Sequence, residues 1–364
     1  MKLSDVCTKA TSNIAQKDLD ARNGAYPIYG ASGFIKNVDF YHQDKPYIAI
    51  VKDGAGVGRV MQLPAKSSVI GTMQYIIPNE GVSVEYLAYA LEHMNLSKYY
   101  LGAAIPHIYF KDYCNESLPN HTQEEQEQIS RTLGMITNLI SLRKQQLSKL
   151  DELVKSRFIE MFGTLSSHEQ NFEILTIEAL CSLIKDGTHQ TPTYTEDTIN
   201  GFKFLSSKDV MTEKIDWSDI KYIPSDLHER LYAVVKPIRN DILMSKNGVN
   251  YGVAAVNDTD EVFDIYVSLA LLRPKTDIIN PVYFRCAINN PDTKRQFDGS
   301  IKGIGVPNLH LGEIKKTQIL VPPMDKQIEY VSFVEQIDKS KFEIQQSLKK
   351  LETLKKALMQ KYFG

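Results

Sequence analysis

A long internal repeat constrains the fold of this chain more than any other feature. The stretch from Thr122 to Gly163 recurs as Pro323 to Gly364, and one offset of 201 residues superimposes the two copies without a gap. An internal repeat of this length predicts a molecule built from two related halves. The identical pairs are Gln126 with Gln327, Ile136 with Ile337, Gln145 with Gln346, Leu147 with Leu348, Lys149 with Lys350, Leu150 with Leu351, Leu153 with Leu354, Lys155 with Lys356, Phe162 with Phe363 and Gly163 with Gly364.

Each copy has the pattern of a long helix that packs on another helix. Arg143 and Arg157 interrupt the first apolar stripe, whereas Lys341 and Lys355 interrupt the second at non-equivalent positions, which suits two helices of one chain. Because no proline follows the first turn, each helix can extend over about 40 residues, or ~60 Å, and a glycine closes each copy. The apolar residues recur every three or four positions, at Ile129, Leu133, Ile136, Ile140, Leu147, Leu150, Val154 and Met161, and at Tyr330, Val334, Ile337, Ile344, Leu348, Leu351, Leu358 and Tyr362.

A generic coiled coil would explain the helical stripes alone. The shared offset favours a pseudo-symmetric molecule in which a two-helix spacer separates two globular domains. The predicted regions are a first domain at 1–118, a first long helix at 119–163, a second domain at 164–320 and a second long helix at 321–364.

The two domains repeat the same order of features, which predicts two related α/β folds. A buried-strand run followed by a glycine turn comes first, then a short helix, then a glycine-containing apolar segment. We also expect a last strand between that segment and the first long helix. The paired ranges are 47–60 with 241–253, 84–94 with 281–288, and 102–108 with 303–309, the last pair again at an offset of 201 residues.

Composition excludes several classes of protein. The 364 residues suffice for two domains with cores of their own. A net charge of −2 argues against DNA binding by this chain alone, because neutralisation of phosphates supplies most non-specific affinity. The cysteines Cys7, Cys114, Cys181 and Cys286 form no CxxC or Cys/His cluster, so we expect reduced thiols and no structural zinc. Without an apolar N-terminal segment or an apolar run of about 18 residues, a cytoplasmic protein with no membrane partner is expected.

Two short motifs suggest catalytic chemistry, and both are weak. The loop from Lys52 to Gly58 is rich in glycine, but strand-like sequence follows it, whereas phosphate-binding loops open a helix. A tight strand-to-strand turn that presents a lysine is the better interpretation. Asp292, Glu313 and Lys315 match the signature of magnesium-dependent nucleases, in which two carboxylates hold the metal beside a lysine. A nuclease that uses these residues stays as one alternative, and a coiled-coil scaffold without DNA contact as another.

The loop at 185–192, Lys-Asp-Gly-Thr-His-Gln-Thr-Pro, is the most distinctive segment of the second domain. It places hydrogen-bonding side chains around one glycine, and another polar segment follows at 202–208. Such side chains read base edges or hold phosphates. An exposed turn is the plain alternative. His189 could act as a catalytic base, but no serine or cysteine nucleophile motif accompanies it, and the [ND]PP[YF] motif of methyltransferases is absent.

Taken together, these features resemble the specificity subunit of type I restriction-modification enzymes. The resemblance covers essentially the whole chain and rests on its organisation. Its elements are the DGTH-x-TP loop at 186–192, the Tyr-Pro-Ile-Tyr-Gly segment at 26–30, the proline-linked entries into the two repeated helices at 119–126 and 322–327, and the Phe-Gly ends of those helices. The first domain departs from the pattern, because it is short and has no DGTH-type loop.

The resemblance implies a function and a set of partners. Two α/β target-recognition domains, related by a pseudo-twofold, would each read half of a bipartite site in double-stranded DNA. The two long helices would pack antiparallel as a coiled coil and dock two methyltransferase subunits, which restriction and translocase subunits join from outside. The chain itself would be non-catalytic and without a cofactor, and S-adenosylmethionine, ATP and Mg²⁺ would belong to the partner subunits.

Polar loop residues are the candidates for DNA contact. In the first domain they are Tyr29, Ser32, Lys36, Lys52 and Arg59, and in the second they are Lys185, Thr188, His189, Gln190, Lys203, Ser207, Lys208, Lys246 and Asn247.

Overall fold

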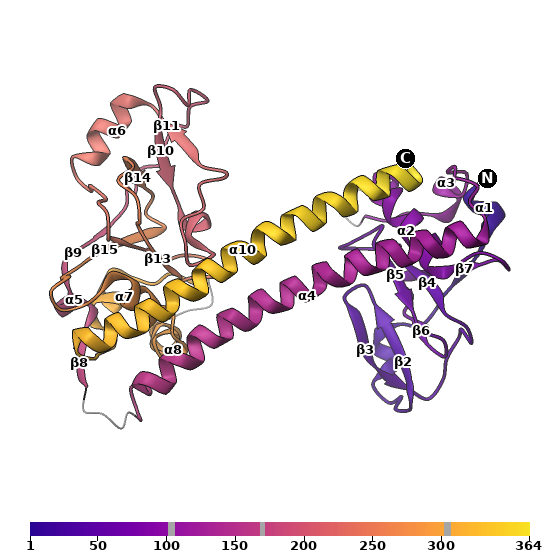
Figure 1. Cartoon of the computed structure of the whole chain (residues 1–364), viewed down its shortest axis with the longest axis horizontal. Helices are drawn as coiled ribbons and strands as arrows, with labels where there is room; N and C mark the ends of the chain where they lie inside the picture. Colours follow the sequence, from indigo (N-terminus) through magenta and orange to yellow (C-terminus); the bar gives the residue numbers. More distant parts are fainter. Residues whose placement is uncertain (101–105, 168–171, 302–306) are drawn as a thin grey trace. The chain divides into compact units, whose positions relative to one another are not determined.

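The computed structural model describes residues 1–100, 106–167, 172–301 and 307–364. The chain divides into two compact units, one formed by 1–146 with 343–364 and the other by 147–342. Both units are mixed α/β structures, as expected (Figure 1). Within the described ranges, no helix has both the length and the apolar character that a membrane crossing requires.

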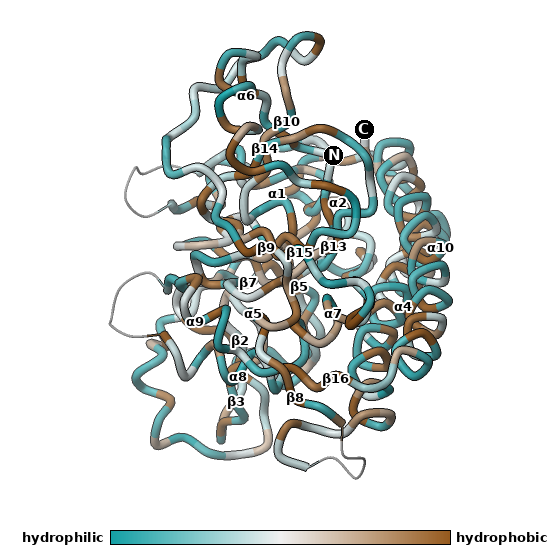
Figure 2. Tube along the Cα trace, turned by 90° about the vertical axis from the view of Figure 1, so that its left-hand side faces the viewer, coloured by the Kyte–Doolittle hydropathy of each residue, from teal (hydrophilic) through white to brown (hydrophobic). Residues whose placement is uncertain are grey.

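The two long helices have equivalent bounds. Helix α4 spans Gln123–Phe162 and helix α10 spans Met324–Phe363, so each has 40 residues and both begin and end at the predicted offset. Every apolar position of the two predicted stripes is buried or half-buried. Figures 1 and 2 show the helices side by side, and Figure 2 shows hydrophobic and hydrophilic residues alternating along each of them. The predicted helix pair is confirmed.

Ion pairs between the helices fix their relative direction. In the first unit, the Lys144 ammonium on α4 lies 3.1 Å from the Glu352 carboxylate on α10. In the second unit, Lys341 on α10 pairs with Asp151 on α4. In the same unit, Arg157 on α4 lies 4.0 Å from Glu329 on α10, so the residue number rises along one helix as it falls along the other, and the helices run antiparallel. Because the Lys144–Glu352 pair is exposed, it contributes little stability, and the buried apolar stripe holds the helices together.

The first unit contains two sheets. The main sheet has strand order β1-β7-β4-β5 and is antiparallel, and the small sheet has order β3-β2-β6, in which β2 and β6 are parallel. Every residue of the central strand β4 is buried, which is why its sequence YIAIV is apolar throughout. The bounds are α1 Leu3–Val6, β1 Cys7–Thr11, η1 Gln16–Leu19, β2 Tyr26–Gly30, β3 Gly33–Val38, β4 Tyr47–Val51, β5 Val60–Leu63, β6 Ser68–Val69, β7 Met73–Pro78, α2 Val84–His93, η2 Leu96–Tyr99 and α3 Phe110–Tyr113.

The second unit contains an antiparallel main sheet of order β13-β12-β15-β9, a sheet of order β11-β10-β14 and the strand pair β16-β8. Its bounds are β8 Glu173–Thr176, α5 Ile177–Leu180, β9 Cys181–Asp186, β10 Phe202–Leu205, η3 Ser207–Val210, β11 Lys221–Ile223, α6 Ser225–Tyr232, β12 Ile242–Ser245, β13 Ala254–Val256, β14 Phe263–Ile265, β15 Leu269–Pro274, α7 Pro281–Ile288, α8 Pro291–Ser300, α9 Leu311–Lys316 and β16 Gln318–Val321.

The two units share one topology. Strands β1, β7, β4 and β5 correspond in order and pairing to β9, β15, β12 and β13. The parallel pair β2-β6 corresponds to β10-β14, and the hairpin partner β3 corresponds to β11. The short helix after the main sheet is α2 in one unit and α7 in the other. The pseudo-symmetry inferred from the repeated helices therefore extends through both globular domains.

One prediction about the first domain is wrong, and another cannot be followed completely. Between residues 106 and 122 the chain forms helix α3 and isolated bridges, not the expected strand before α4. Only the second unit has a strand there, β16, because β8 supplies a pairing partner for it. Most of the predicted equivalent segments at 102–108 and 303–309 lies outside the described residues.

Candidate nucleic-acid interface

The glycine turn after the central strand is built in the same way in both units. Gly54 and Gly248 adopt φ values of 85° and 88°, which side chains rarely tolerate. Their amides donate to the carbonyls of Pro106 at 2.9 Å and of Pro307 at 3.1 Å. Each turn connects two strands, β4 to β5 or β12 to β13, and opens no helix. The expectation of a strand-to-strand turn is confirmed.

In the first unit the structure brings together Tyr29, Ser32 and Arg59. Ser32 is exposed at the turn between β2 and β3. The Arg59 guanidinium reaches this hairpin and donates to the Ala31 carbonyl at 2.9 Å. The Tyr29 ring packs edge-to-face on Phe34 across the same hairpin, with centroids 6.0 Å apart. A polar hairpin tip and an arginine side chain thus share one exposed surface.

The two lysine candidates of this unit have partners of their own. Lys36, on β3, donates from Nζ to the Leu19 carbonyl at 3.0 Å. The Lys52 ammonium lies 2.6 Å from the Asp53 carboxylate. Lys36 thus belongs to the hairpin that carries Ser32, and its ammonium is anchored on a backbone carbonyl, whereas the charge of Lys52 is compensated by its neighbour in sequence.

In the second unit the DGTH loop leaves the end of β9 and is held by the backbone of residues 265–267. A Cβ at Gly187 would stand 2.3 Å from the Ile265 carbonyl oxygen, so only glycine fits this approach. The Thr188 amide donates to the same carbonyl at 3.0 Å, and its hydroxyl oxygen accepts from the Gln190 amide at 3.1 Å. These contacts leave the side chains of His189 and Gln190 exposed.

An ion pair joins this loop to the glycine turn. The ammonium of Lys246 donates to the Asp186 carboxylate, and the Lys246 side chain is only 6% exposed. Nε2 of His189 lies 3.8 Å from the other oxygen of Asp186. Next to Lys246, Oδ1 of Asn247 is buried, with no hydrogen-bond partner in the described part of the chain. The buried Lys246 side chain therefore stabilises the loop through Asp186, and the exposed side chains of His189 and Gln190 face solvent.

A cavity of about 430 Å³ lies under the DGTH loop. Its walls include the apolar side chains of Leu231, Val234 and Ile265. Lys185 lines the cavity and donates from Nζ to the Val234 carbonyl at 3.0 Å. This contact ties the strand that precedes the loop to the segment after α6.

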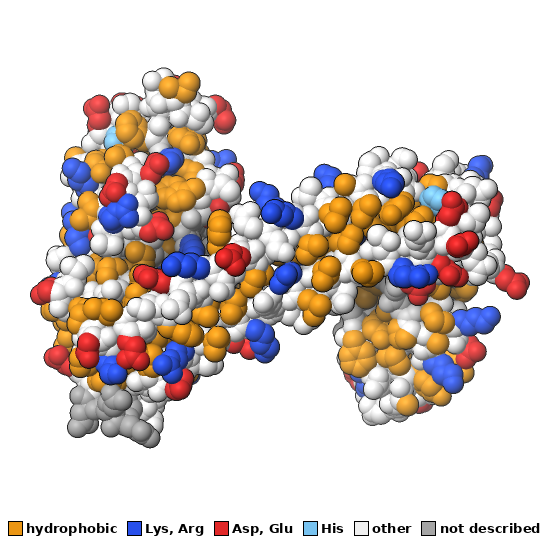
Figure 3. Space-filling view, viewed as in Figure 1, with side chains coloured by type: hydrophobic (Ala, Val, Ile, Leu, Met, Phe, Trp, Pro, Cys, Tyr) orange, Lys and Arg blue, Asp and Glu red, His pale blue; other side chains and the backbone are white. Residues whose placement is uncertain are grey.

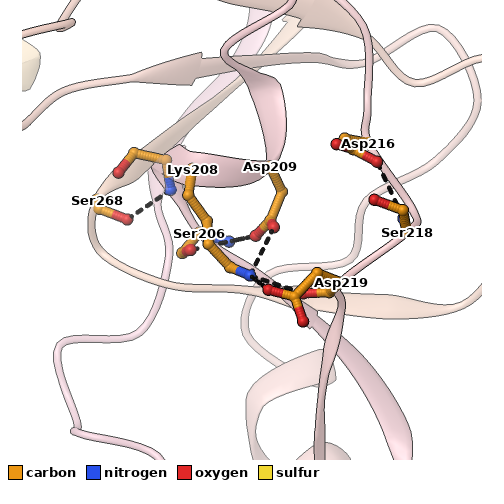
Figure 4. A network of polar contacts seen from close by, with 8 residues as sticks. Ser206, Lys208, Asp209, Asp216, Ser218, Asp219 and Ser268 are labelled. Atoms are coloured by element: carbon orange, nitrogen blue, oxygen red, sulfur yellow. Dashed lines mark hydrogen bonds and ion pairs between the residues drawn. The ribbon is translucent and has the colours of Figure 1, made fainter. Parts of the chain in front are cut away.

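Lys208 belongs to a separate polar network (Figure 4). The Lys208 ammonium donates to Asp219 through the carboxylate at 2.7 Å and the carbonyl at 2.6 Å, and lies 3.6 Å from the buried Asp209. The hydrogen bond between Lys208 and Asp219 lowers the pKa of the Asp219 carboxyl and raises the pKa of the Lys208 ammonium. The Ser207 amide donates to the Ser268 hydroxyl at 3.0 Å.

Lys203 is also neutralised by a carboxylate. It pairs with Glu261 and lies 5.1 Å above the Trp217 ring. Lys52, Lys203, Lys208 and Lys246 thus all have carboxylate partners. Carboxylates therefore compensate the charge of these four lysines, in keeping with the net charge of −2, whereas Lys36, Arg59 and Lys185 contact backbone carbonyls.

Sequence analysis overlooked exposed apolar residues on the same loops. Phe34, beside the Ser32 hairpin, is 60% exposed, and Val249, in the glycine turn of the second unit, is 87% exposed. Their positions next to glycines in predicted turns were the signal of exposure. Apolar side chains of this kind can contact the methyl group of thymine in the major groove.

The nuclease constellation is not assembled. Asp292 accepts from the Leu165 amide and pairs with Arg295, whereas Lys315 pairs with Glu178 at 3.1 Å. The third residue, Glu313, pairs instead with a neighbouring lysine of its own helix. Among the residues described, no group of three or more potential ligands is placed to hold a metal ion. The arrangement gives no support to metal-dependent cleavage.

Comparison with known proteins agrees with this organisation. The family described as type I restriction modification DNA specificity domain matches residues 1–152 and 188–356, and the chain belongs to this family. It is 22% identical over 334 residues to the type I restriction enzyme MjaVIII specificity subunit of Methanocaldococcus jannaschii, covering 84% of this chain and 77% of that protein. With the MjaIX specificity subunit of the same organism it shares 23% identity over 309 residues, covering 79% of this chain and 69% of that protein.

The fold has a counterpart among solved structures. The crystal structure of the type I restriction-modification S subunit from M. genitalium covers 100% of this chain and 95% of its own, with a TM-score of 0.59 and 15% identity. The chain is the DNA specificity subunit of a type I restriction-modification system, and it acts with DNA within such a complex. Subunits of this family are non-catalytic and carry no cofactor, since S-adenosylmethionine and ATP belong to the other subunits.

Proposed function

We propose that each of the two units reads one half of a bipartite DNA site. The observation that supports this proposal is that both units have the same sheet topology. Each unit is followed by a long helix, and the bounds of the two helices differ by the same offset of 201 residues. Two copies of a recognition fold on one chain fit a target with two separate halves. In this proposal the target-recognition domains are 1–118 and 164–320, and the spacer regions are 119–163 and 321–364.

The DNA-facing surface of each domain consists of its polar loops. In the first domain the Ser32 hairpin, with Tyr29 and Arg59, reads bases, while Lys36 and Lys52 lie further along the contact. In the second domain the DGTH loop reads bases, because its exposed side chains are held on a backbone that is itself fixed. The proposed contacts there are Lys185, Thr188, His189, Gln190, Lys203, Ser207, Lys208 and Asn247, with Lys246 acting through its support of the loop.

The exposed faces of the long helices dock two methyltransferase subunits. Met135, Leu139 and Leu142 recur along one side of α4 and are 65%, 44% and 49% exposed. On α10, Ile328 is 51% exposed and Phe342 is 60% exposed. Apolar side chains gather along the visible surface of the helices in Figure 3. Exposed apolar residues on paired helices mark a surface that a partner covers, and restriction subunits join the assembly from outside.

The partners also supply most of the DNA affinity. Because most of the candidate lysines are paired with carboxylates, this chain can release few counterions from DNA. The methyltransferase subunits therefore provide the phosphate contacts, the S-adenosylmethionine and the chemistry, and the restriction subunits use ATP and Mg²⁺. The complex works in the cytoplasm, where it meets its DNA.

A methylation map tests this proposal. The chain is co-expressed with the methyltransferase subunit of its system in a host without other DNA methylation, and methylated bases are located across the genome. The expected result is one motif made of two short defined sequences that flank a gap of fixed length. Methylation of a single uninterrupted motif would contradict the reading of separate half-sites.

A further inference from the structure

In each unit both long helices meet at the first turn of one short helix. In the first unit this is the start of α2, where Ser83 caps the helix and Tyr86 follows three residues later. In the second unit it is the start of α7, where Asn280 caps the helix and Tyr283 follows three residues later. We refer to Ser83 with Tyr86, and to Asn280 with Tyr283, as the two sockets.

The first contact in each socket comes from the long helix that starts in that unit. In the first unit, Oε1 of Gln126 on α4 accepts from the Ser83 amide at 3.1 Å, and its Nε2 donates to the His121 carbonyl at 3.1 Å. Gln126 is 5% exposed. Its amide thus joins the first turn of α4 to the capping residue of α2.

The second unit repeats this contact at the equivalent position. Oε1 of Gln327 on α10 accepts from the Asn280 amide at 2.8 Å, and its Nε2 donates to the carbonyls of Pro322 at 2.8 Å and Ile278 at 3.1 Å. Gln327 is 0% exposed. A buried amide with all these partners is sensitive to small shifts, because an unmade bond inside the protein is costly.

The second contact comes from the long helix that ends in the same unit. Phe363, at the end of α10, packs on Tyr86, and Phe162, at the end of α4, packs on Tyr283. The ring centroids are 5.3 Å apart in both cases. In each unit, one tyrosine therefore packs on the end of the long helix that terminates there. The neighbouring N-cap residue is hydrogen-bonded to the first turn of the long helix that begins there.

The tyrosine hydroxyls complete the sockets at residues that are again 201 positions apart. Tyr283 donates to the Leu320 carbonyl at 2.9 Å, and the Tyr86 hydroxyl lies 3.4 Å from the Pro119 carbonyl and 2.8 Å from Nδ1 of His121. Leu320 and Pro119 belong to the segments that lead into α10 and α4. Each hydroxyl thus fixes the path by which the chain passes from the globular domain into its long helix.

We propose that the two sockets set the angle at which each recognition domain stands on the helices, and so determine the gap between the half-sites that the complex accepts. Gln126, Tyr86, Gln327 and Tyr283 are then positioning residues for DNA recognition. This inference rests on the proposed reading of a bipartite site. It assigns gap selection to side chains far from the polar loops that choose the bases.

The geometry of DNA explains why a small change of angle matters. One additional base pair moves the second half-site by about 3.4 Å and turns it by about 35° around the DNA axis. A domain held by a hydrogen-bonded cap and a packed tyrosine tolerates neither change. When the hydrogen bonds of the socket are removed, the domain can turn, and gaps that differ by one base pair become acceptable.

The test uses the complete methyltransferase complex and the target found in the methylation map of the wild-type complex. Duplexes carry that target with its natural gap, or with a gap one base pair shorter or longer. Dissociation constants are measured for the wild type, for Tyr283→Phe and Gln327→Leu in the second socket, and for Tyr86→Phe and Gln126→Leu in the first. The matched control is Tyr47→Phe, which loses a buried hydroxyl bonded to Ser67 at 3.0 Å inside the first domain but outside both sockets.

The quantity that decides is the ratio of affinities for the natural and altered gaps. We expect the wild type and Tyr47→Phe to prefer the natural gap by about tenfold or more, as for a mismatched base pair, and the socket variants to prefer it by less than about threefold. Substitution of a base in either half-site should weaken all variants equally.

Other results overturn the inference. A socket variant that assembles and keeps the wild-type ratio shows that the sockets do not select the gap. Failure of both the Phe and the Leu variants to assemble shows that the sockets only hold the fold. If the wild-type complex methylates no bipartite motif, the proposed function itself fails, and this outcome is visible before any variant is made.

Discussion

Lys246 and Asp186 form an ion pair that links the glycine turn after β12 to the DGTH loop, although 60 residues of sequence separate the two side chains. The ammonium is nearly excluded from solvent, while the carboxylate keeps a side-chain exposure of 21%. Lys246 is thus a support for the DGTH loop. In the first unit the equivalent Lys52 pairs with the adjacent Asp53.

We expect Lys246→Met to destabilise the chain and disturb recognition of one half-site. Asp186 would lose the charged donor that faces it, at a cost of about 2 kcal/mol in the free energy of unfolding. Lys52→Met is the matched control, and because the Lys52 side chain is 26% exposed its loss should cost less than about 1 kcal/mol. Urea denaturation measures both values. Equal destabilisation by the two changes would show that the Lys246 pair does not hold the loop.

His189→Ala combined with Gln190→Ala should change methylation at one half-site and leave assembly intact. Both side chains are exposed on a loop outside the long helices. Each lost base contact should cost ~1–3 kcal/mol of discrimination. The measurement is the methylation map of the variant complex, with co-purification of the methyltransferase subunit as the assembly control. Unchanged preference at both half-sites would remove this loop from base reading.

The isolated chain should bind DNA weakly and without sequence preference. Four of its six candidate lysines, Lys52, Lys203, Lys208 and Lys246, are paired with carboxylates, which reduces the number of phosphates that the chain can neutralise. Fluorescence anisotropy at physiological salt should show specific binding only after the methyltransferase subunits are added. A nanomolar specific complex formed by this chain alone would contradict the idea that affinity comes from the partners.

Two aspartates of the second unit should affect acid stability in opposite directions. Burial raises the pKa of Asp264 in spite of its 2.6 Å contact with His228, so its favourable contribution is present below the unfolded pKa of about 3.9 and is lost as pH rises through the folded value. In Asp264→Asn, the free energy of unfolding should therefore decrease less than in the wild type as the pH rises above about 4.

The pKa of Asp219 is lowered by Lys208, so the sign is reversed. Its contribution is present above about pH 3.9 and is lost as pH falls through the folded value. Asp219→Asn should make the chain lose less stability on acidification. Urea denaturation at a series of pH values measures both variants, and changes of the same sign would mean that the environments of the two carboxyls have been misassigned.

The sequence predicted the long helices well because their signal is local. Apolar residues every three or four positions define both the helix and its buried side, and the repeat adds the bounds. The buried strand at 47–51 was equally readable, since a strand covered on both faces is apolar throughout. Pseudo-symmetry then predicted a second domain with the same elements.

The candidate site was less predictable because its contacts join residues far apart in sequence. The pairing of Lys203 with Glu261 and of Lys246 with Asp186 depends on how strands are arranged in the sheet, and no local pattern encodes it. The exposure of Phe34 depends on its position in a hairpin tip. Polar composition selected the candidate loops, while tertiary contacts decide which of their side chains are exposed.

Lengthening the two long helices together should lengthen the gap between the half-sites. Lys349 on α10 is the equivalent of Ser148 on α4 at the offset of 201 residues, so four residues inserted after Ser148 should be matched by four after Lys349. This addition is close to one turn and extends each helix by ~6 Å while keeping the buried stripe nearly in phase. Since base pairs rise by about 3.4 Å, the preferred gap should grow by ~1–2 base pairs with unchanged half-sites.

Three-residue insertions at the same positions are the matched control. They turn the apolar stripe away from its partner helix, so they should reduce assembly more than the four-residue insertions. A methylation map of the four-residue variant provides the measurement. If that complex assembles and methylates sites with the original gap, the long helices hold the domains together without setting the distance between them.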